Sequence, residues 1–356
     1  MNVDEKDAAR RLHGAAVEQS LREARHRLAA WEDDLLAHFA HGPDVQPAKI
    51  IPRLVLVEQE SQKRLFRYAA LHWSIPVSSG YGRRLRYLVE DAANGKLIGI
   101  IGLADPVFAL TDRDKWIGWS KTRRERALRC VMDAFVLGAV PPYSMLLGGK
   151  LVAVLATSAE IEDEFWRKYG RTPALISGRR QRHRLAMITT TSAYGRSSLY
   201  NRIRLDGRDA WIHVGATRGH GEFLFSGRLY ERLHAFVDAH ARPNARAAGW
   251  GKPIHWRNRR EVVRKALGLL DLPYALHVHG LERAIYVAPL GPNAREWLAG
   301  GEEKMEFFGR SAAQLAAAAL TRWVLPRAER DARWKTFDAE TLRLWSDRAR
   351  RQAVRR

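Results

Sequence analysis

Cysteine is almost absent from this sequence, since Cys130 is the single one among 356 residues. One thiol excludes a framework of internal disulfide bonds and a cysteine-rich zinc site. Long apolar runs are missing too: none reaches the about 18 residues that a transmembrane helix needs, and the first residues lack the apolar stretch of a secretory signal. We therefore expect a cytoplasmic protein without membrane contact.

Acidic residues are scarce relative to basic ones. The chain has 39 Asp and Glu against 60 Lys and Arg, a formal net charge of +21. This excess is larger than solubility requires and indicates a polyanionic partner, for which DNA, ahead of RNA, is the first candidate. The hydrophobic share of 46% is enough for a substantial core.

Hydrophobic spacing divides the chain into three expected regions. Residues 1–46 predict a helical N-terminal arm, because their apolar residues recur at helical spacing. Residues 47–241 predict an α/β core, and residues 252–356 predict a basic C-terminal α/β region. The order of helices, hairpin and alternating strands and helices predicts the α+β class, with a mixed sheet and flanking helices.

The clearest local signal is a hairpin followed by a strand, a loop and a helix. Asn94-Gly95 separates two apolar runs and aligns Tyr87–Val89 with Ile98–Ile101. A later apolar run breaks at Pro141-Pro142 and resumes with helical spacing after Gly148-Gly149. Weaker patterns predict strands over Thr172–Gly178 and Ala275–His279, and a charged aromatic loop over Thr111–Trp119.

The loop before that helix is a candidate anion site. Glycines let the backbone approach a ligand closely, and the first N–H groups of a helix attract negative charge. A phosphate or pyrophosphate would rest there; the alternative is that both glycines serve packing alone. The candidate cofactor-binding residues are Tyr143, Leu147, Gly148, Gly149 and Lys150.

Polar residues after the predicted strands suit acyl transfer with an acyl-CoA-like cofactor. A carboxylate such as Asp105 or Asp133 would deprotonate an amine. Tyr194 or Tyr200 would then protonate the leaving thiolate. The alternative role for Asp105, which precedes a proline, is to start a turn.

Metal-dependent cleavage of a phosphodiester is a second chemistry for the same residues. Asp105, Asp114 and Asp133 would hold Mg²⁺, while Arg196 or Lys150 would neutralise the developing charge. No spacing among these carboxylates is diagnostic of a nuclease, so acyl transfer ranks first.

Basic and aromatic residues near these positions are candidates for DNA contacts. The alternatives are a solvated loop for the arginine run and core packing for the tryptophan. We expect the histidines at 213, 220, 277 and 279 to be ordinary rather than metal ligands, and we predict no metal-binding residues. The candidate nucleic-acid-binding residues are Arg113, Trp116, Arg179, Arg180, Arg182, Arg184, Arg196 and Arg202.

Four long motifs occur in order along the chain: RYLVEDAANGKLIGIIGLADPVF, RDKWIGW, MDAFVLGAVPPYSMLLGGKLVA and ITTTSAYGRSSLYNRI. From about Arg84 to about Phe225 this succession resembles the family of DruA, a component of the Druantia anti-phage defence systems. The resemblance implies bacterial antiviral defence together with other proteins of the system.

The order of the central elements is similar to a second family. A hairpin, a strand, a loop with Gly148-Gly149, a helix and a strand followed by Tyr194 and Tyr200 resemble the core of GNAT-type acyltransferases, including phage enzymes that modify adenine in DNA. This similarity implies a GNAT-like core.

Together these expectations describe a DNA-binding defence protein that modifies DNA through a GNAT-like active site. One alternative is a metal-dependent nuclease or a transposition-related DNA-processing protein. The other is a non-catalytic DNA-recognition subunit that recruits partner defence proteins.

Overall fold

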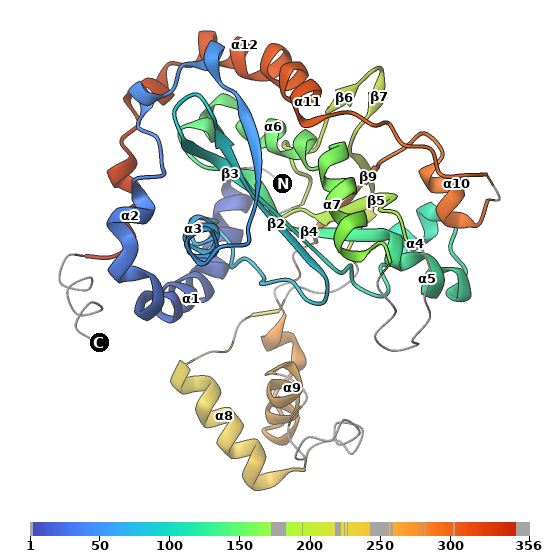
Figure 1. Ribbon diagram of the computed structural model, residues 1–356. Helices are drawn as coiled ribbons and strands as arrows, with labels where there is room; N and C mark the ends of the chain where they lie inside the picture. The colour runs from blue at the N-terminus through green and yellow to red at the C-terminus, as the bar shows by residue number, and fades with distance from the viewer. Residues whose placement is uncertain are drawn as a thin grey trace. The chain divides into compact units, whose positions relative to one another are not determined.

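A computed structural model of the chain describes residues 3–171, 183–193, 195–217, 222–223, 225, 227–242, 256, 259–278, 280, 282–301 and 303–346 (Figure 1). The chain divides into two compact units. The smaller comprises Met1–Glu23, Ser74–Pro76 and Arg218–Glu282, and the larger comprises Ala24–Trp73, Val77–Thr217 and Arg283–Arg356. Among the described residues, every helix is too short or too polar to cross a lipid bilayer.

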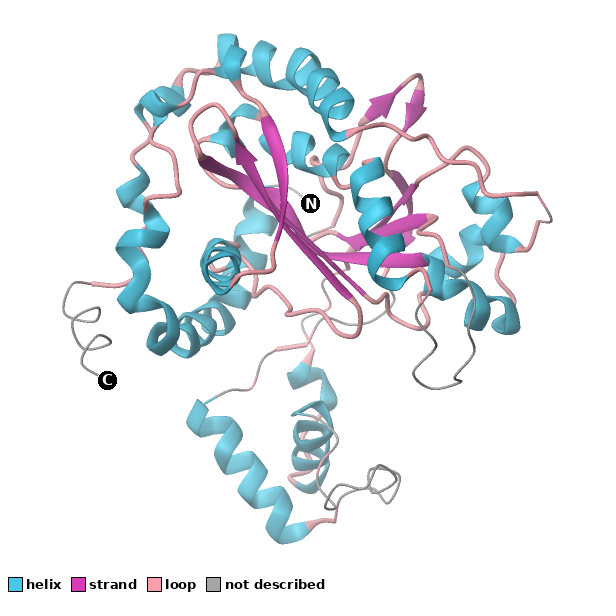
Figure 2. Ribbon diagram, viewed as in Figure 1, coloured by secondary structure: helices cyan, strands magenta, loops and turns pink. Residues whose placement is uncertain are grey.

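The larger unit contains a mixed seven-stranded sheet in the order β1-β2-β3-β4-β5-β9-β8 (Figure 2). A separate ribbon pairs β6 with β7. The predicted α+β class, with a mixed sheet and flanking helices, is confirmed. The strands are β1 (Pro52–Leu56), β2 (Arg84–Asp91), β3 (Lys96–Ala104), β4 (Val131–Ala139), β5 (Met187–Thr191), β6 (Arg204–Leu205), β7 (Arg208–Asp209), β8 (Ile212–Ala216) and β9 (Ala284–Pro289).

The predicted hairpin is formed by β2 and β3, which pair antiparallel. Tyr87 lies opposite Ile101 and Val89 opposite Gly99, as the sequence pattern predicts. Gly95 in the turn has a φ of 72°, a left-handed conformation that glycine adopts without strain. The hairpin register is therefore set by the turn and by the alternation of buried residues.

Strands β4 and β5 pair in parallel, whereas the other neighbours in this sheet are antiparallel. The parallel ladder has three residue pairs and ends at Asp133 and Thr189. Both strands continue past that pair, β4 to Ala139 and β5 to Thr191. We call the end of this ladder the β4–β5 fork.

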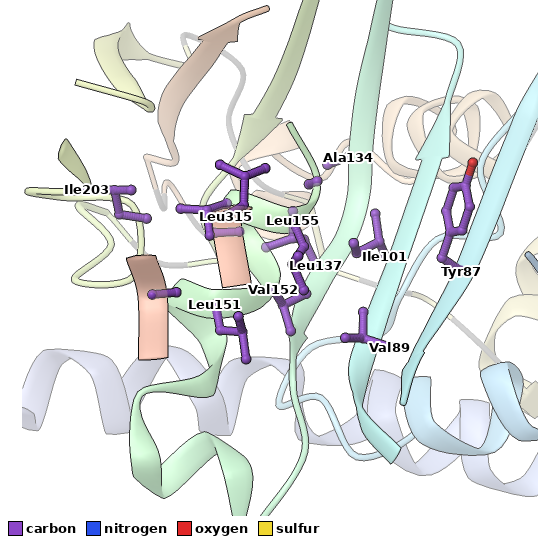
Figure 3. Packing of buried hydrophobic residues seen from close by; sticks show 14 of the residues in the cluster. Tyr87, Val89, Ile101, Ala134, Leu137, Leu151, Val152, Leu155, Ile203 and Leu315 are labelled. Carbon is purple, nitrogen blue, oxygen red and sulfur yellow. The ribbon is translucent and has the colours of Figure 1, made fainter. Parts of the chain in front are cut away.

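Helices cover both faces of the sheet. On one face, α6 (Gly148–Leu155) and α11 (Ala312–Ala319) pack against it. Alternate strand residues such as Val89, Ile101 and Leu137 meet Leu151 and Leu315 there (Figure 3). On the other face, α3 (Glu60–Ala70) packs against β2 and β3. Burying each such aliphatic side chain contributes roughly 1.5–3 kcal/mol, so this core fixes where the ends of β3, β4 and β5 lie.

The helices of the larger unit are α2 (Glu32–Leu36), α3 (Glu60–Ala70), α4 (Thr111–Ile117), α5 (Lys121–Ala127), α6 (Gly148–Leu155), α7 (Ala159–Tyr169), α10 (Ala294–Ala299), α11 (Ala312–Ala319) and α12 (Leu325–Arg330). Helix α1 (Val3–Leu28) begins in the smaller unit and ends in the larger one. Strand β4 is followed by a short 3₁₀ helix, η5 (Tyr143–Leu146), and then by α6, so the predicted strand, loop and helix are present.

Two predictions of local structure are wrong. The charged aromatic loop is instead mostly helix α4, because buried Arg113 and Asp114 form an ion pair that the sequence pattern does not reveal. A strand was also predicted over Ala275–His279. Its residues up to His277 instead belong to a 3₁₀ helix, η7 (Tyr274–His277), which begins directly after Pro273. The strand predicted over Thr172–Gly178 lies outside the described residues.

The smaller unit contains a pair of helices, α8 (Gly227–His240) and α9 (Arg259–Leu269), that pack on each other. Val237, Val262, Ala266 and Trp256 form their buried core. The Trp256 indole N–H donates a hydrogen bond of 2.5 Å to Asp238, which satisfies its polar atom.

Candidate active site at the β4–β5 fork

Asp133 is the last residue of β4 in the parallel ladder. The Thr189 hydroxyl donates a hydrogen bond of 2.8 Å to its carboxylate. Burial raises the pKa of Asp133 to about 6, although this hydrogen bond and the charges of Arg283 and Arg113 lower it. The residue remains partly exposed. A carboxyl group that titrates near neutral pH and is reached by solvent is suited to proton transfer.

Tyr200 approaches the same point from the turn after β5. It is 7% exposed, and its ring lies 5.0 Å from the rings of Trp211 and Tyr286. Burial raises the pKa of Tyr200 to about 12, with a further increase from the charge of Asp133 and a decrease from a hydrogen bond with Thr190. Tyr200 therefore stays protonated at neutral pH, close enough to Asp133 for their charges to interact.

Arg283 is a site residue that the sequence did not indicate. It precedes β9, and its guanidinium donates hydrogen bonds of 3.2 Å and 2.6 Å to the carbonyl oxygens of Thr191 and Ser192. Burial lowers the pKa of Arg283, while Asp133 and Tyr200 raise it. It thus joins the end of β5 to β9 beside both predicted catalytic residues. An isolated arginine before an apolar strand carries no motif that could have marked it.

Asp105 follows β3, where Ala104 is paired with Asp133. Its carboxylate forms a 2.6 Å ion pair with Arg83 and accepts the Arg83 backbone N–H at 3.1 Å. Both carboxylate oxygens are therefore bound within the protein. Tyr194, the remaining predicted catalytic residue, lies outside the described residues.

Two side chains of the predicted cofactor loop make contacts within the fold. Tyr143 is 1% exposed and donates a hydrogen bond of 2.9 Å to Asp91. Lys150 Nζ donates to the carbonyl oxygens of Ser198, Leu199 and Asn201 at 2.9–3.2 Å. Three contacts match the three protons of an ammonium group. Lys150 therefore anchors the turn that carries Tyr200.

The glycines of the same loop lie against neighbouring atoms. A Cβ at Gly148 would lie 2.6 Å from the Tyr143 carbonyl oxygen, and one at Gly149 would lie 2.9 Å from Leu199. Leu147 has a φ of 59°, which turns the chain into α6. The turn after β5 thus packs on the start of α6, where a pyrophosphate would bind. Both loop glycines therefore permit close packing at the start of α6.

Three of the predicted DNA-contacting residues are used within the protein. Arg113 is fully buried and pairs with Asp114 at 2.7 Å. One face of Trp116 is covered by the Arg295 guanidinium, 4.9 Å from the ring centroid. Arg184 forms a two-point ion pair with Glu162. Its Nε atom donates to Glu162 Oε1, and its Nη2 atom donates to Glu162 Oε2 at 2.7 Å.

Two others, Arg196 and Arg202, are exposed on the turn after β5. The remaining three, Arg179, Arg180 and Arg182, lie outside the described residues. A basic cluster that we did not predict consists of Arg83, Arg129 and His183, which lie before β2, β4 and β5. Burial and the charge of Arg83 lower the pKa of Arg129. Burial and the charges of Arg129 and Arg83 lower the pKa of His183 to about 4. A bound anion would favour the charged form of such crowded groups.

A metal site requires several ligands at one point. Within the described ranges, no three His, Cys, Asp or Glu side chains come together in this way. Asp114 is paired with Arg113 at 2.7 Å and with Arg124 at 3.0 Å. The three aspartates suggested for Mg²⁺ therefore do not fit a shared ion in this arrangement.

Comparison with known proteins identifies the family of this chain. A family model described as Druantia protein DruA matches residues 3–300. The Druantia protein DruA of Escherichia coli (strain UMEA 4076-1) is 40% identical over 339 residues, which cover 95% of this chain and 83% of that protein. No solved structure matches the chain significantly. The chain therefore belongs to the DruA family and is a Druantia anti-phage defence protein.

Proposed function

We propose that this chain contributes to anti-phage defence by binding DNA and modifying it, with Asp133 as the general base. The observation that carries the proposal is the position of Asp133, a partly exposed carboxyl with a pKa of about 6 at the end of the parallel ladder. At neutral pH such a carboxylate would accept the proton that an amino group of a DNA base loses as its nitrogen forms a bond to the electrophilic carbon of an activated group donor. Tyr200 would protonate the leaving group of that donor as its bond to the transferred group breaks.

Tyr200 is the proposed proton donor of the site. Its pKa of about 12 keeps the phenol protonated, and Thr190 and Trp211 hold its ring in place. Asp133 and Tyr200 thus divide the roles of base and acid, because their environments separate their pKa values. Arg283 is a positioning residue in this scheme, since it ties β5 to β9 and does not itself exchange a proton.

The order of elements supports a GNAT-like core as part of this proposal. The β2–β3 hairpin, β4, the loop with Gly148 and Gly149, α6 and β5 follow one another as in the family that the sequence resembles. Asp133 and Tyr200 flank the strand pair on which such a site would be built. Lys150 of α6 also binds the turn that carries Tyr200, which joins the predicted cofactor loop to the proposed site.

Charge supports DNA as the substrate. The net charge of +21 favours a polyanion. Burial and the charge of Arg83 lower the pKa of Arg129, and a bound anion would favour the charged form of Arg129. Arg196 and Arg202 are exposed and remain proposed phosphate contacts, as do the arginines at 179, 180 and 182. These contacts would hold the DNA backbone while Asp133 acts on a base.

A non-catalytic DNA-recognition subunit is the second candidate. One observation favours it: Tyr143, Lys150 and both loop glycines make contacts within the protein. In this scheme the chain would bind DNA and recruit other proteins of the Druantia system. The raised pKa of Asp133 would then be a cost of burial with no catalytic use.

The experiment combines binding with analysis of the DNA. Purified wild-type protein and Asp133→Asn would be titrated with DNA across a salt series. DNA from infected cells that carry the complete system with either form would then be digested to nucleosides and weighed. A mass change with wild type alone supports modification. Binding without any mass change favours the recognition subunit, and absence of binding contradicts both.

A further inference from the structure

We propose that Phe108 and Tyr81 form a stacking platform that receives an unpaired DNA base beside Asp133. This inference rests on the proposed action on DNA and specifies its substrate: a base in a single strand or one turned out of a duplex. Three observations carry it, namely a rigidly held exposed loop, an aromatic ring with one face supported, and the location next to the candidate base.

The segment from Asp105 to Leu110, which we call the 105–110 loop, exposes apolar side chains. Val107 is 48% exposed and Phe108 is 54% exposed. Fully buried Arg113 donates hydrogen bonds to their carbonyl oxygens at 3.1 Å and 3.4 Å. A buried guanidinium is costly unless its hydrogen bonds are satisfied, so these contacts hold the loop in one position.

The Phe108 ring is supported from one side. The Arg124 guanidinium lies 4.7 Å from its centroid, and Arg124 is itself fixed by an ion pair of 3.0 Å with Asp114. Because the guanidinium covers one face, the exposed area of the ring lies on its other face and edges. An aromatic ring held in this way stacks a base of any sequence, since every base has a π face.

Tyr81 supplies the second ring. It is 50% exposed, and its carbonyl oxygen accepts the Asp105 backbone N–H at 3.1 Å. Asp105 follows Ala104, which is paired with Asp133 across β3 and β4. Burial and the charges of Asp133 and Asp105 raise the pKa of Tyr81, while Arg113 lowers it, in agreement with this placement. Tyr81 and the 105–110 loop therefore lie beside the end of β3 at which Asp133 is paired.

The chemistry of this surface selects an unpaired base rather than an intact duplex. Inside a duplex both faces of a base are stacked, and enzymes that act on a base must take it out of the stack. Arg83 donates a hydrogen bond of 2.7 Å to the carbonyl oxygen of Arg129, so Arg129 lies at the same end of the sheet as Asp105 and would attract a flanking phosphate. A base stacked on Phe108 and Tyr81 would thus present its edge to Asp133.

The test uses the full chain and three DNA probes of one sequence: a single strand with 2-aminopurine, its duplex, and a single strand with an abasic site at that position. The variants are Phe108→Ala, Phe108→Leu and Tyr81→Ala. The matched control is Trp31→Ala, because Trp31 is 43% exposed and has the Arg64 guanidinium 4.1 Å from its ring but lies outside the site. Thermal unfolding is measured to check that each variant folds. Phe108→Leu keeps an apolar side chain without the π face.

We expect Phe108→Ala and Phe108→Leu to weaken binding of the 2-aminopurine strand about tenfold and to remove its fluorescence change. Binding of the abasic strand and the dependence on salt should remain, because phosphate contacts are intact. Variants that bind and quench like wild type would overturn the stacking platform while leaving DNA binding in place. Wild-type protein that binds none of the probes would overturn the proposed function as well.

Discussion

The Thr189 hydroxyl lies 2.8 Å from the Asp133 carboxylate, across the last pair of the parallel ladder between β4 and β5. This contact joins two strands at the point where their backbone pairing stops. It fixes the orientation of the carboxyl group while leaving it partly exposed. A fixed, accessible carboxyl group is what proton abstraction requires, so the relationship links the fold to the proposed chemistry.

The pH dependence of DNA modification should follow the ionisation of Asp133. Burial raises its pKa to about 6, and only the deprotonated form acts as a base. We expect the rate at limiting DNA to rise about tenfold per pH unit below pH 6 and to level off above it. Nucleoside mass analysis over a pH series measures this, and a rate unchanged between pH 5 and pH 7 would exclude Asp133 as the base.

Replacement of Asp133 by Asn should stabilise the fold at neutral pH. The carboxyl pKa is about 6 in the folded chain against 3.8 ordinarily, so the folded state binds more protons between these values. Wild-type stability therefore falls as the pH rises through this window, by an amount on the order of 2 kcal/mol.

Asp133→Asn lacks this titration. Urea unfolding of both proteins at pH 5 and pH 7.5 measures the difference, which should favour the variant more at the higher pH. An equal difference at both pH values would show that the Asp133 pKa is not raised by folding.

Arg113→Ala should strongly destabilise the larger unit. Arg113 is fully buried and bonded to Asp114 and to the 105–110 loop, so its loss leaves buried polar groups unpaired, at a cost of about 3–5 kcal/mol. Arg333→Ala is the control: its side chain is 78% exposed in its ion pair with Asp331, and we expect a change below about 1 kcal/mol. Chemical denaturation compares them. Similar small losses would contradict a buried role for Arg113.

The two loop glycines should differ in their tolerance of a methyl group. At Gly148 the new Cβ meets a backbone oxygen at 2.6 Å, and we expect Gly148→Ala to cost roughly 1–3 kcal/mol. At Gly149 it meets the Leu199 Cδ1 atom at 2.9 Å, which can rotate away, so Gly149→Ala should be nearly neutral. Thermal unfolding distinguishes them. Equal tolerance would contradict the packing role of Gly148.

The sequence predicted those features that depend on residues near one another in the chain. Asn94-Gly95 between apolar runs fixes the β2–β3 register, and Gly148-Gly149 after a strand marks the start of α6. The sequence pattern wrongly predicted a loop at Thr111–Trp119. Helix α4 forms there because Arg113 is buried among the carbonyl groups of a preceding loop. Charged residues in a short segment look like a loop unless their buried partners are known.

The candidate site was accessible to sequence reasoning only in part. Asp133 and Tyr200 were predicted as catalytic residues because each belongs to or follows a strand, but no pattern stated that β4 and β5 pair in parallel. Arg283 could not be predicted, since it reaches the site through the pairing of β5 with β9 across some ninety residues of chain. Tertiary pairing, and not local spacing, creates this part of the site.

The most direct measurement of the central claim is phage protection by the complete Druantia system carrying Asp133→Asn. The matched control is Asp163→Asn, which changes an exposed carboxyl group on α7. Expression and DNA affinity of both variants are measured in parallel. We predict that Asp133→Asn binds DNA like wild type but loses protection by at least an order of magnitude in plating efficiency, while Asp163→Asn keeps it. Full protection by Asp133→Asn would contradict the account.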